Sequence, residues 1–224
     1  MGCDVCNNVS DDFKVDGLDE MLIQLSTDLV TIEAKYPDSE LLKKKEEILK
    51  NRHEELLKTD LKDESKVESV VKKFNNEELK IDNDLIKNKL DKMHEQYEAG
   101  LKVCQQVKNK LIEKLEKKLE SANSLAKTAL NTQIEKVKSY SPAQFLDSEF
   151  GKPIKDTLEK QGLSESALKE YKDGLRNQRA ERRKKEREEF GIKQNEWPEE
   201  EAFDDDTQNL YQKMLDEYKD KMEL

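Results

Sequence analysis

A long segment without helix-breaking residues constrains this chain more than any other feature. Between Asp38 and Tyr140 the sequence contains no proline and only one glycine, Gly100. The segment is rich in Glu, Lys and Leu, and its apolar residues recur at helical spacing, which is typical of long amphipathic helices. Because a helical rod encloses no pocket of its own, we expect a protein that is not an enzyme and that holds neither a cofactor nor a metal.

Composition limits the size of the hydrophobic core. The chain is 41% charged, 34% hydrophobic and 6% aromatic, whereas an average domain has about 25% charged and about 45–50% apolar residues. Charges of both signs are interleaved and apolar positions are periodic, which favours helices over disorder. We therefore predict an all-α fold. It would be an elongated antiparallel helical hairpin or bundle, or a coiled coil, with one very long helix, followed by short helices and a flexible charged C-terminal region.

Local signals divide residues 17–140, the predicted helical rod, into separate helices. An amphipathic helix begins at Leu18 and ends before Pro37, because the residue before a proline is disfavoured in a helix. A second helix follows, with leucines seven residues apart at positions 42, 49 and 56. Ser65 has the form of a capping-box start, Asn75–Asn76 predicts a break, and the longest helix is predicted from Glu77 to Tyr140.

The longest predicted helix carries an apolar stripe with an eleven-residue repeat. Such a repeat averages about 3.67 residues per turn, so the stripe runs almost straight along a helix. Since a helix this polar is not stable alone, we expect the stripe to pack on other helices, on a second copy of the chain or on a partner protein. The predicted packing residues are Leu90, Met93, Tyr97, Leu101, Cys104, Ile112, Leu115, Leu119, Leu130, Ile134 and Val137.

The pattern changes after the rod. Ser141 followed by Pro142 predicts the start of a new helix, since serine is a good N-cap and proline is tolerated in the first turn. We expect residues 141–191 to form short helices that end in a basic helix. Residues 192–206 are predicted to be an acidic linker, and residues 207–224 a C-terminal amphipathic helix.

The predicted basic helix contains a cluster of cationic side chains. Three interpretations stay open: a solvated helix face, a contact with an acidic protein surface, phospholipid or tubulin-like tail, and a nucleic-acid contact or nuclear signal. The net charge of the chain, −10, argues against nucleic acid as the main partner. The members of the cluster are Arg176, Arg179, Arg182, Arg183, Lys184, Lys185 and Arg187.

The acidic linker contains two aromatic residues, Trp197 and Phe203. Aromatic side chains exposed among acids often serve as docking segments. The alternative is that both side chains fold back onto the helices.

Residues 1–16, the predicted flexible tail, begin with MGCDVC. This segment resembles the leaders of dually acylated signalling proteins such as Src-family kinases, some of which share Met-Gly-Cys-x-x-Cys. The resemblance covers these six residues and implies myristoylation of Gly2 and palmitoylation of Cys3 and Cys6. One acyl chain anchors a protein only weakly, so the cysteines would supply the second signal. The alternative is an ordinary solvated N-terminus with incidental cysteines.

These features together lead to an expected function. We expect a non-enzymatic scaffold or tether that acts through helix–helix contacts and is lipid-anchored at the cytoplasmic face of a membrane. The alternative is a cytoskeletal or ciliary structural protein that lies along microtubules or another polymer, with the basic helix on the acidic polymer surface. The sequence shows neither a secretory signal nor an apolar run of bilayer length, so the expected location is cytoplasmic, at the inner face of a membrane or on the cytoskeleton.

Overall fold

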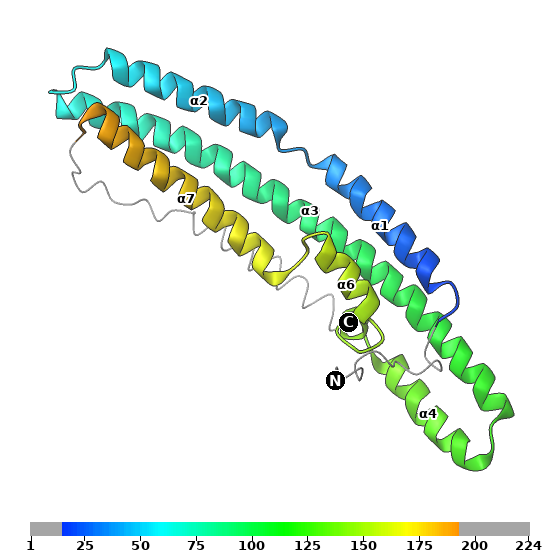
Figure 1. The fold of residues 1–224 in the computed structure, drawn as a ribbon. Coiled ribbons are helices and arrows are strands. Elements are labelled where there is room, and N and C mark those ends of the chain that lie inside the picture. The colour runs from blue at the N-terminus through cyan, green and yellow to red at the C-terminus, as the bar shows by residue number, and fades with distance from the viewer. Residues whose placement is uncertain (1–14, 193–224) are drawn as a thin grey trace, which may run out of the picture. The chain divides into compact units, whose positions relative to one another are not determined.

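The computed structural model describes residues 15–192. Every regular element in that range is an α-helix, which confirms the all-α prediction (Figure 1). The helices are α1 (Leu18–Lys35), α2 (Ser39–Lys58), α3 (Glu64–Ser121), α4 (Ser124–Ser139), α5 (Pro142–Leu146), α6 (Lys152–Lys160) and α7 (Glu165–Phe190).

The long helix differs from the prediction at both ends. The break predicted at Asn75–Asn76 is wrong, because α3 runs through both residues. The single helix predicted from Glu77 to Tyr140 is also wrong, since α3 ends at Ser121 and α4 begins at Ser124. Asn123 is the N-cap of α4, and its side chain accepts a hydrogen bond from the backbone N–H of Ala126 at 3.0 Å. This cap satisfies an amide that the new helix leaves free.

Helix starts follow short polar side chains elsewhere in the chain. Ser141 caps α5 as predicted, and it exchanges hydrogen bonds with Gln144 in a capping box. Ser65 is not the cap of α3, although the sequence predicted a capping box there. Asp63 takes that place, because its carboxylate accepts from the backbone N–H of Lys66 at 3.1 Å.

The described residues belong to two compact units. The first unit contains residues 15–33 and 93–163, and the second contains residues 34–92 and 164–192. Helix α3 supplies its C-terminal half to the first unit and its N-terminal half to the second. Each unit therefore combines segments that are distant in the sequence.

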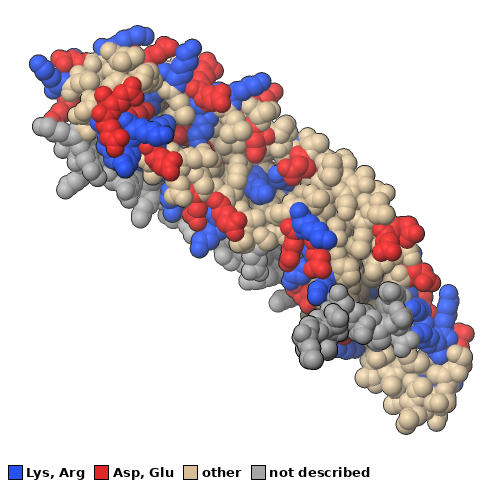
Figure 2. Space-filling view, in the orientation of Figure 1, with Lys and Arg blue, Asp and Glu red and all other residues tan. Residues whose placement is uncertain are grey.

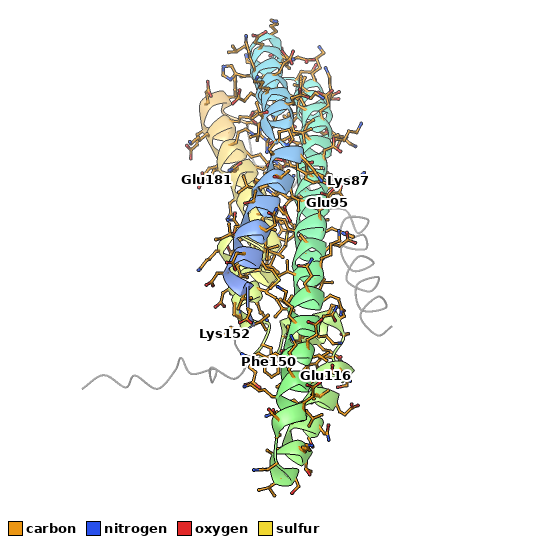
Figure 3. All side chains as sticks on the ribbon, turned by 90° about the vertical axis from the view of Figure 1, so that its right-hand side faces the viewer. Lys87, Glu95, Glu116, Phe150, Lys152 and Glu181 are labelled. Carbon is orange, nitrogen blue, oxygen red and sulfur yellow. The ribbon has the colours of Figure 1, made fainter. Side chains whose placement is uncertain are left out.

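The first unit is built on an apolar core. This core draws buried side chains from α1, α3, α4, α5 and α6, all at most 8% exposed. Helix α4 is folded back along α3, because Lys138 near the end of α4 lies 3.0 Å from Glu116 of α3, which is labelled in Figure 3. Core members include Leu25, Leu29, Cys104, Leu111, Leu115, Ile134, Val137, Phe145, Ile154 and Leu158.

A lysine on α3 also holds the end of α4. Lys108 is 9% exposed, and its Nζ donates to the carbonyl oxygens of Lys138, at 3.0 Å, and Tyr140. The last carbonyls of a helix have no partner within it, so a cation placed there satisfies them and also complements the helix dipole. This contact fixes where the α4 helix ends against α3.

In the second unit, α2 and the N-terminal half of α3 run in opposite directions. Leu56, near the end of α2, packs in one apolar cluster with Val67, near the start of α3. At the other end, Asn88 of α3 donates a hydrogen bond to Asp38, just before α2, at 2.9 Å. The short loop between the two helices makes this antiparallel pairing the simplest arrangement.

Helix α7 packs beside this pair and runs in the same direction as α2. Tyr171, near its start, lies 3.5 Å from the carboxylate of Asp38, and Phe190, at its end, joins the apolar cluster of Leu56 and Val67. Charged side chains such as Lys87 on α3 and Glu181 on α7 are exposed on this unit (Figure 3). Figure 2 shows Lys and Arg interleaved with Asp and Glu on the face in view, without a broad area of one sign.

Candidate functional site

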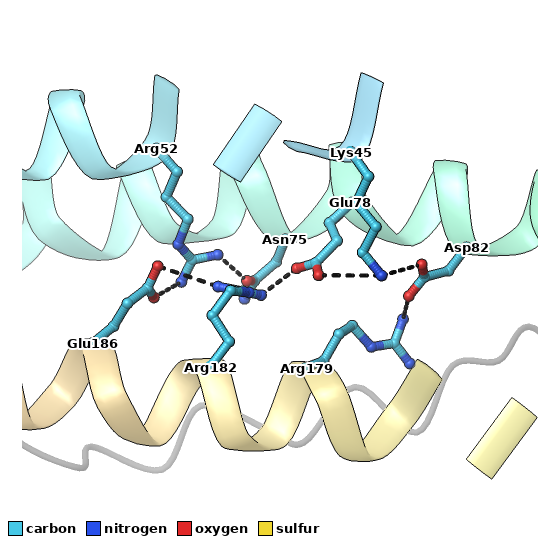
Figure 4. Close-up of polar contacts among 8 residues, drawn as sticks. All are labelled: Lys45, Arg52, Asn75, Glu78, Asp82, Arg179, Arg182 and Glu186. Carbon is cyan, nitrogen blue, oxygen red and sulfur yellow. Dashed lines mark hydrogen bonds and ion pairs between the residues drawn. The ribbon is translucent and has the colours of Figure 1, made fainter. Parts of the chain in front are cut away.

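The second unit contains a buried group of charged and amide side chains between its three helices, which we call the polar network (Figure 4). Charged residues are rarely buried in proteins unless they are paired. The members of the polar network are Lys45, Arg52, Asn75, Glu78, Asp82, Arg179, Arg182 and Glu186.

Helical spacing brings these side chains together. On α3, Asn75, Glu78 and Asp82 follow one another at intervals of three and four residues. The same intervals separate the three members on α7, and the two members on α2 are seven residues apart. Residues at these intervals share one face of a helix. Each helix therefore presents a polar stripe where an apolar seam would be the usual choice.

Asp82 links all three helices of the unit. Its side chain is 0% exposed, and its two oxygens accept from Lys45 Nζ on α2 at 2.6 Å and from Arg179 Nη1 on α7 at 3.0 Å. Burial raises the pKa of Asp82 because desolvation disfavours the carboxylate, while Lys45 and then Arg179 act in the opposite direction. Loss of either cation would leave this buried carboxyl without one of its two partners.

Glu78 makes a second link one turn earlier on α3. It is 1% exposed, and its carboxylate accepts from Arg182 Nη2 on α7. Its other oxygen lies 3.7 Å from Lys45 Nζ. Arg182 also lies 3.2 Å from Glu186, four residues further along α7. The acids of α3 are thus bridged to α7 at two successive turns.

Arg52 completes the polar network from α2. Its side chain is 2% exposed, and its Nη2 lies 2.7 Å from Glu186 Oε2. Its Nη1 donates to Asn75 Oδ1 at 2.5 Å. Desolvation lowers the pKa of Arg52, and the charge of Glu186 opposes this shift. Arg52 therefore joins α2 to both α3 and α7.

The polar network is not fully balanced. It holds four cations and three carboxylates, and within the described part of the chain the Nε atoms of Arg52 and Arg182 have no hydrogen-bond partner. Removing ions from water costs free energy that pairing only partly returns, so such a network adds little net stability. The polar network can favour one register of the three helices over shifted registers, because in a shifted register the cations would no longer lie opposite their acids.

The predicted basic cluster is divided by this arrangement. Arg179 and Arg182 point into the polar network, so the expectation that the whole segment 176–187 is solvated or lies on a partner is wrong for these two residues. The other members stay nearer the surface: Arg176, Lys184 and Lys185 are exposed, and Arg183 and Arg187 are partly buried.

The predicted packing stripe lies on two helices rather than one. Its first eight members are on α3 and its last three, Leu130, Ile134 and Val137, are on α4, because the chain turns at Asn123. Cys104 is a stripe member on α3, and its burial raises the pKa of its thiol to about 12. The buried members are Leu90, Cys104, Leu115, Ile134 and Val137, and the partly buried members are Met93, Tyr97, Leu101, Ile112, Leu119 and Leu130.

Two sets of predicted site residues lie outside the described residues. The acylation sites Gly2, Cys3 and Cys6 precede residue 15, and the docking residues Trp197 and Phe203 follow residue 192. Both sets stay predictions.

Six members of the polar network were not predicted as site residues: Lys45, Arg52, Asn75, Glu78, Asp82 and Glu186. A signal for two of them was present on α2, where Leu41, Lys45, Ile48 and Arg52 alternate at intervals of four, three and four. The predicted line of leucines runs beside this seam, and Leu42 is 46% exposed. The predicted line meets the seam at Leu56, which is 0% exposed, so the prediction departs from the seam mainly at the N-terminal end of α2.

No protein-family model, curated protein or solved structure matches this chain. Among the described helices, none combines the length and the apolar character needed to cross a bilayer.

Proposed function

We propose that the protein is a non-enzymatic scaffold or tether that acts through helix–helix contacts. The observation that carries this proposal is the combination of an all-helical described region with large apolar side chains left exposed on helices. Ile23 of α1 is 67% exposed, Leu57 of α2 is 65% exposed and Leu125 of α4 is 86% exposed. Such side chains leave helix surfaces available for helices of other proteins.

The polar network supports the same proposal. A scaffold must hold its own helices in one register while it offers other faces to partners. Asp82 and Glu78 can meet Arg179 and Arg182 in only one alignment of α3 and α7, so the polar network serves this need. An enzymatic function gains no support from the polar network, because the carboxylates of the network are paired with its own cations.

The proposed location is the cytoplasmic face of a membrane, through acylation of Gly2, Cys3 and Cys6. The support is the sequence of the first six residues. A myristoyl chain alone binds membranes with low affinity, and a second acyl chain on a neighbouring cysteine makes the attachment stable.

The cytoskeletal alternative depends on the basic cluster meeting an acidic polymer surface. Arg179 and Arg182 are engaged with Asp82 and Glu78 inside the second unit, so fewer cations of the cluster are available for such a surface. This division favours the tether.

The anchor is tested by labelling with a clickable myristate in eukaryotic cells, followed by membrane fractionation. We expect the wild-type chain to be labelled and to sediment with membranes, and Gly2→Ala to do neither. The double variant Cys3→Ser/Cys6→Ser is the matched control, since it should keep the myristate label yet become largely soluble. An unlabelled, soluble wild-type chain would exclude the anchor.

A further inference from the structure

The outer face of α1 has an unusual composition for this chain. Ile23 is 67% exposed and Val30 is 60% exposed, and their spacing of seven residues places them on one face of the helix. Thr27 and Thr31 are also exposed and lie beside them on this face. We call these four residues the α1 outer face. The opposite side of α1 is already occupied, since Leu25 and Leu29 are 0% exposed in the core of the first unit.

The threonines make the α1 outer face more apolar than their residue type suggests. Thr27 Oγ1 donates to the carbonyl of Ile23 at 3.0 Å, and Thr31 Oγ1 donates to the carbonyl of Thr27 at 3.0 Å. A hydroxyl that bonds the preceding turn is satisfied by the helix itself. The methyl groups of both threonines then remain as contact surface alongside Ile23 and Val30.

The residues of the α1 outer face also lower the intrinsic stability of a surface helix. All four of its residues are β-branched, and β-branched residues lose side-chain freedom in helices compared with Lys, Glu or Gln. The exposed positions of α2 show the usual choice, with Lys43, Lys44, Glu46 and Glu47. This face has a low helix propensity and exposes large apolar groups to water. Binding to a partner explains both features better than a contribution to the stability of the fold does.

The surrounding charges define the partner. Helix α1 contains four acids, and its one basic residue, Lys35, lies at its C-terminal end. Asp19 and Glu20 lie one turn before Ile23, while Asp28 and Glu33 lie to either side of the α1 outer face. Asp19 and Glu20 also favour the helix dipole, but Asp28 and Glu33 lie too far along α1 for that benefit. An apolar face surrounded by acids complements an apolar stripe surrounded by bases.

Other occupants fit less well. A second copy of α1 would bring acids against acids, and an anionic membrane would be repelled by the same acids. Residues 176–187 of a second copy are basic but contain Ala180 as their only apolar residue. Residues 207–224 have an apolar stripe, yet they contain more acids than bases.

We propose that the α1 outer face docks a basic amphipathic helix of a partner protein, with apolar side chains on Ile23 and Val30 and lysine or arginine against the acids of α1. This inference rests on the proposed function, because it assigns a partner class to the scaffold. It makes α1 a two-sided helix, with one side in the core of the first unit and the other on the partner.

The test is fluorescence anisotropy with the purified full-length chain at physiological ionic strength. The probes are three labelled synthetic peptides. One has a leucine stripe flanked by lysines, the second has the same stripe flanked by glutamates, and the third has the lysine composition with scrambled leucine positions. We expect the first peptide to bind at least about tenfold more tightly than either control peptide, since both the stripe and the bases contribute.

Variants of the chain locate the binding. Ile23→Gln/Val30→Gln removes the apolar contact without adding charge, so it should weaken binding of the first peptide by about tenfold or more. The helix should be kept, because glutamine is a better helix former than isoleucine or valine. Leu42→Gln is the control, because Leu42 is 46% exposed but lies on α2, away from the α1 outer face. Absence of binding, equal binding of a control peptide, or an equal loss of binding with Leu42→Gln would overturn the inference.

The outcome is separable from that of the proposed anchor. If the chain binds the lysine peptide but is not myristoylated, the docking face is supported and the anchor is excluded. If the chain is myristoylated and membrane-bound but does not bind the peptide, the anchor is supported and this docking face is excluded.

Discussion

Gly100 shows how one missing side chain determines a helix contact. A Cβ at this position would lie 2.6 Å from Cδ1 of Leu158 on α6, and Leu158 is only 2% exposed. The contact is therefore closer than two side chains allow, and Leu158 has little room to move. This explains why the long segment without helix breakers contains a glycine at all, since glycine in a helix interior costs free energy unless packing requires it.

We predict opposite effects for alanine at two helical glycines. Gly100→Ala should lower the free energy of unfolding by about 1–2 kcal/mol, because overpacking against Leu158 outweighs the gain in helix propensity. Gly174→Ala, on α7, should raise it by about 1 kcal/mol, since no atom lies within 4 Å of the new Cβ. Urea denaturation of the two variants gives both values. Stabilisation by Gly100→Ala equal to that by Gly174→Ala would contradict the close contact.

The residue scale also shows what the sequence could not reveal. Asn123 occupies a polar position in the eleven-residue repeat, and the sequence predicted one continuous helix through it. Its side chain caps α4 at Ala126, and the chain reverses there. The reversal of the chain depends on contacts that Lys108 and Glu116 of α3 make with the end of α4. These are tertiary contacts, which no local sequence pattern contains.

At the scale of elements, α7 is held by a mixture of apolar and charged contacts. Leu168, Leu175 and Phe190 are 3%, 6% and 9% exposed, and Arg179 and Arg182 reach the acids of α3 between them. Apolar contacts supply most of the attraction, whereas charged pairs discriminate between registers. We therefore expect the polar network to matter more for where α7 packs than for how strongly it packs.

Removing one acid of the polar network should be costly. Asp82→Asn leaves Lys45 and Arg179 buried without their shared carboxylate, and breaking such a buried pair costs about 3–5 kcal/mol. Asp84→Asn is the matched control, because Asp84 is an exposed acid on the same helix, and its effect should stay within about 0.5 kcal/mol. Chemical denaturation monitored by circular dichroism measures both. Equal effects of the two variants would exclude a stabilising role of Asp82.

A triple replacement separates stability from specificity in the same experiment. Lys45→Met/Asp82→Leu/Arg179→Met removes charges from both sides at once, so stability should stay the same or rise by about 1–4 kcal/mol. Contacts between α7 and α3, followed by NMR, should then show more than one register. A triple variant less stable than Asp82→Asn would contradict this account of the polar network.

Element prediction from the sequence succeeded where the pattern was local. The all-α class follows from periodicity and composition, and the start of α5 follows from Ser141 and Pro142. The pairing of helices did not follow, because lysine, arginine and acids normally indicate solvent. Lys45 and Arg52 occupy the seam of α2 only because Asp82 and Glu186 lie opposite them, and these acids are remote in the sequence.

At the scale of the whole molecule, each compact unit has a different kind of interior. The first unit has a continuous apolar core, whereas the second combines an apolar cluster at Leu56, Val67 and Phe190 with the polar network. Neither arrangement was predictable from residue ranges, since both units draw on segments from two parts of the chain. In the proposed tether, the interior of each unit holds that unit's exposed helix faces in a fixed arrangement.

The most direct test of the tether is relocation in cells. Residues 1–14 are replaced by a mitochondrial outer-membrane anchor, and a proximity-labelling enzyme reports which proteins gather there. We predict that some proteins accumulate at mitochondria with the chain and not with the anchor alone. These proteins should be lost with Ile23→Gln/Val30→Gln but kept with Leu42→Gln. A set of labelled proteins identical to that of the anchor alone would contradict a function in helix-mediated tethering.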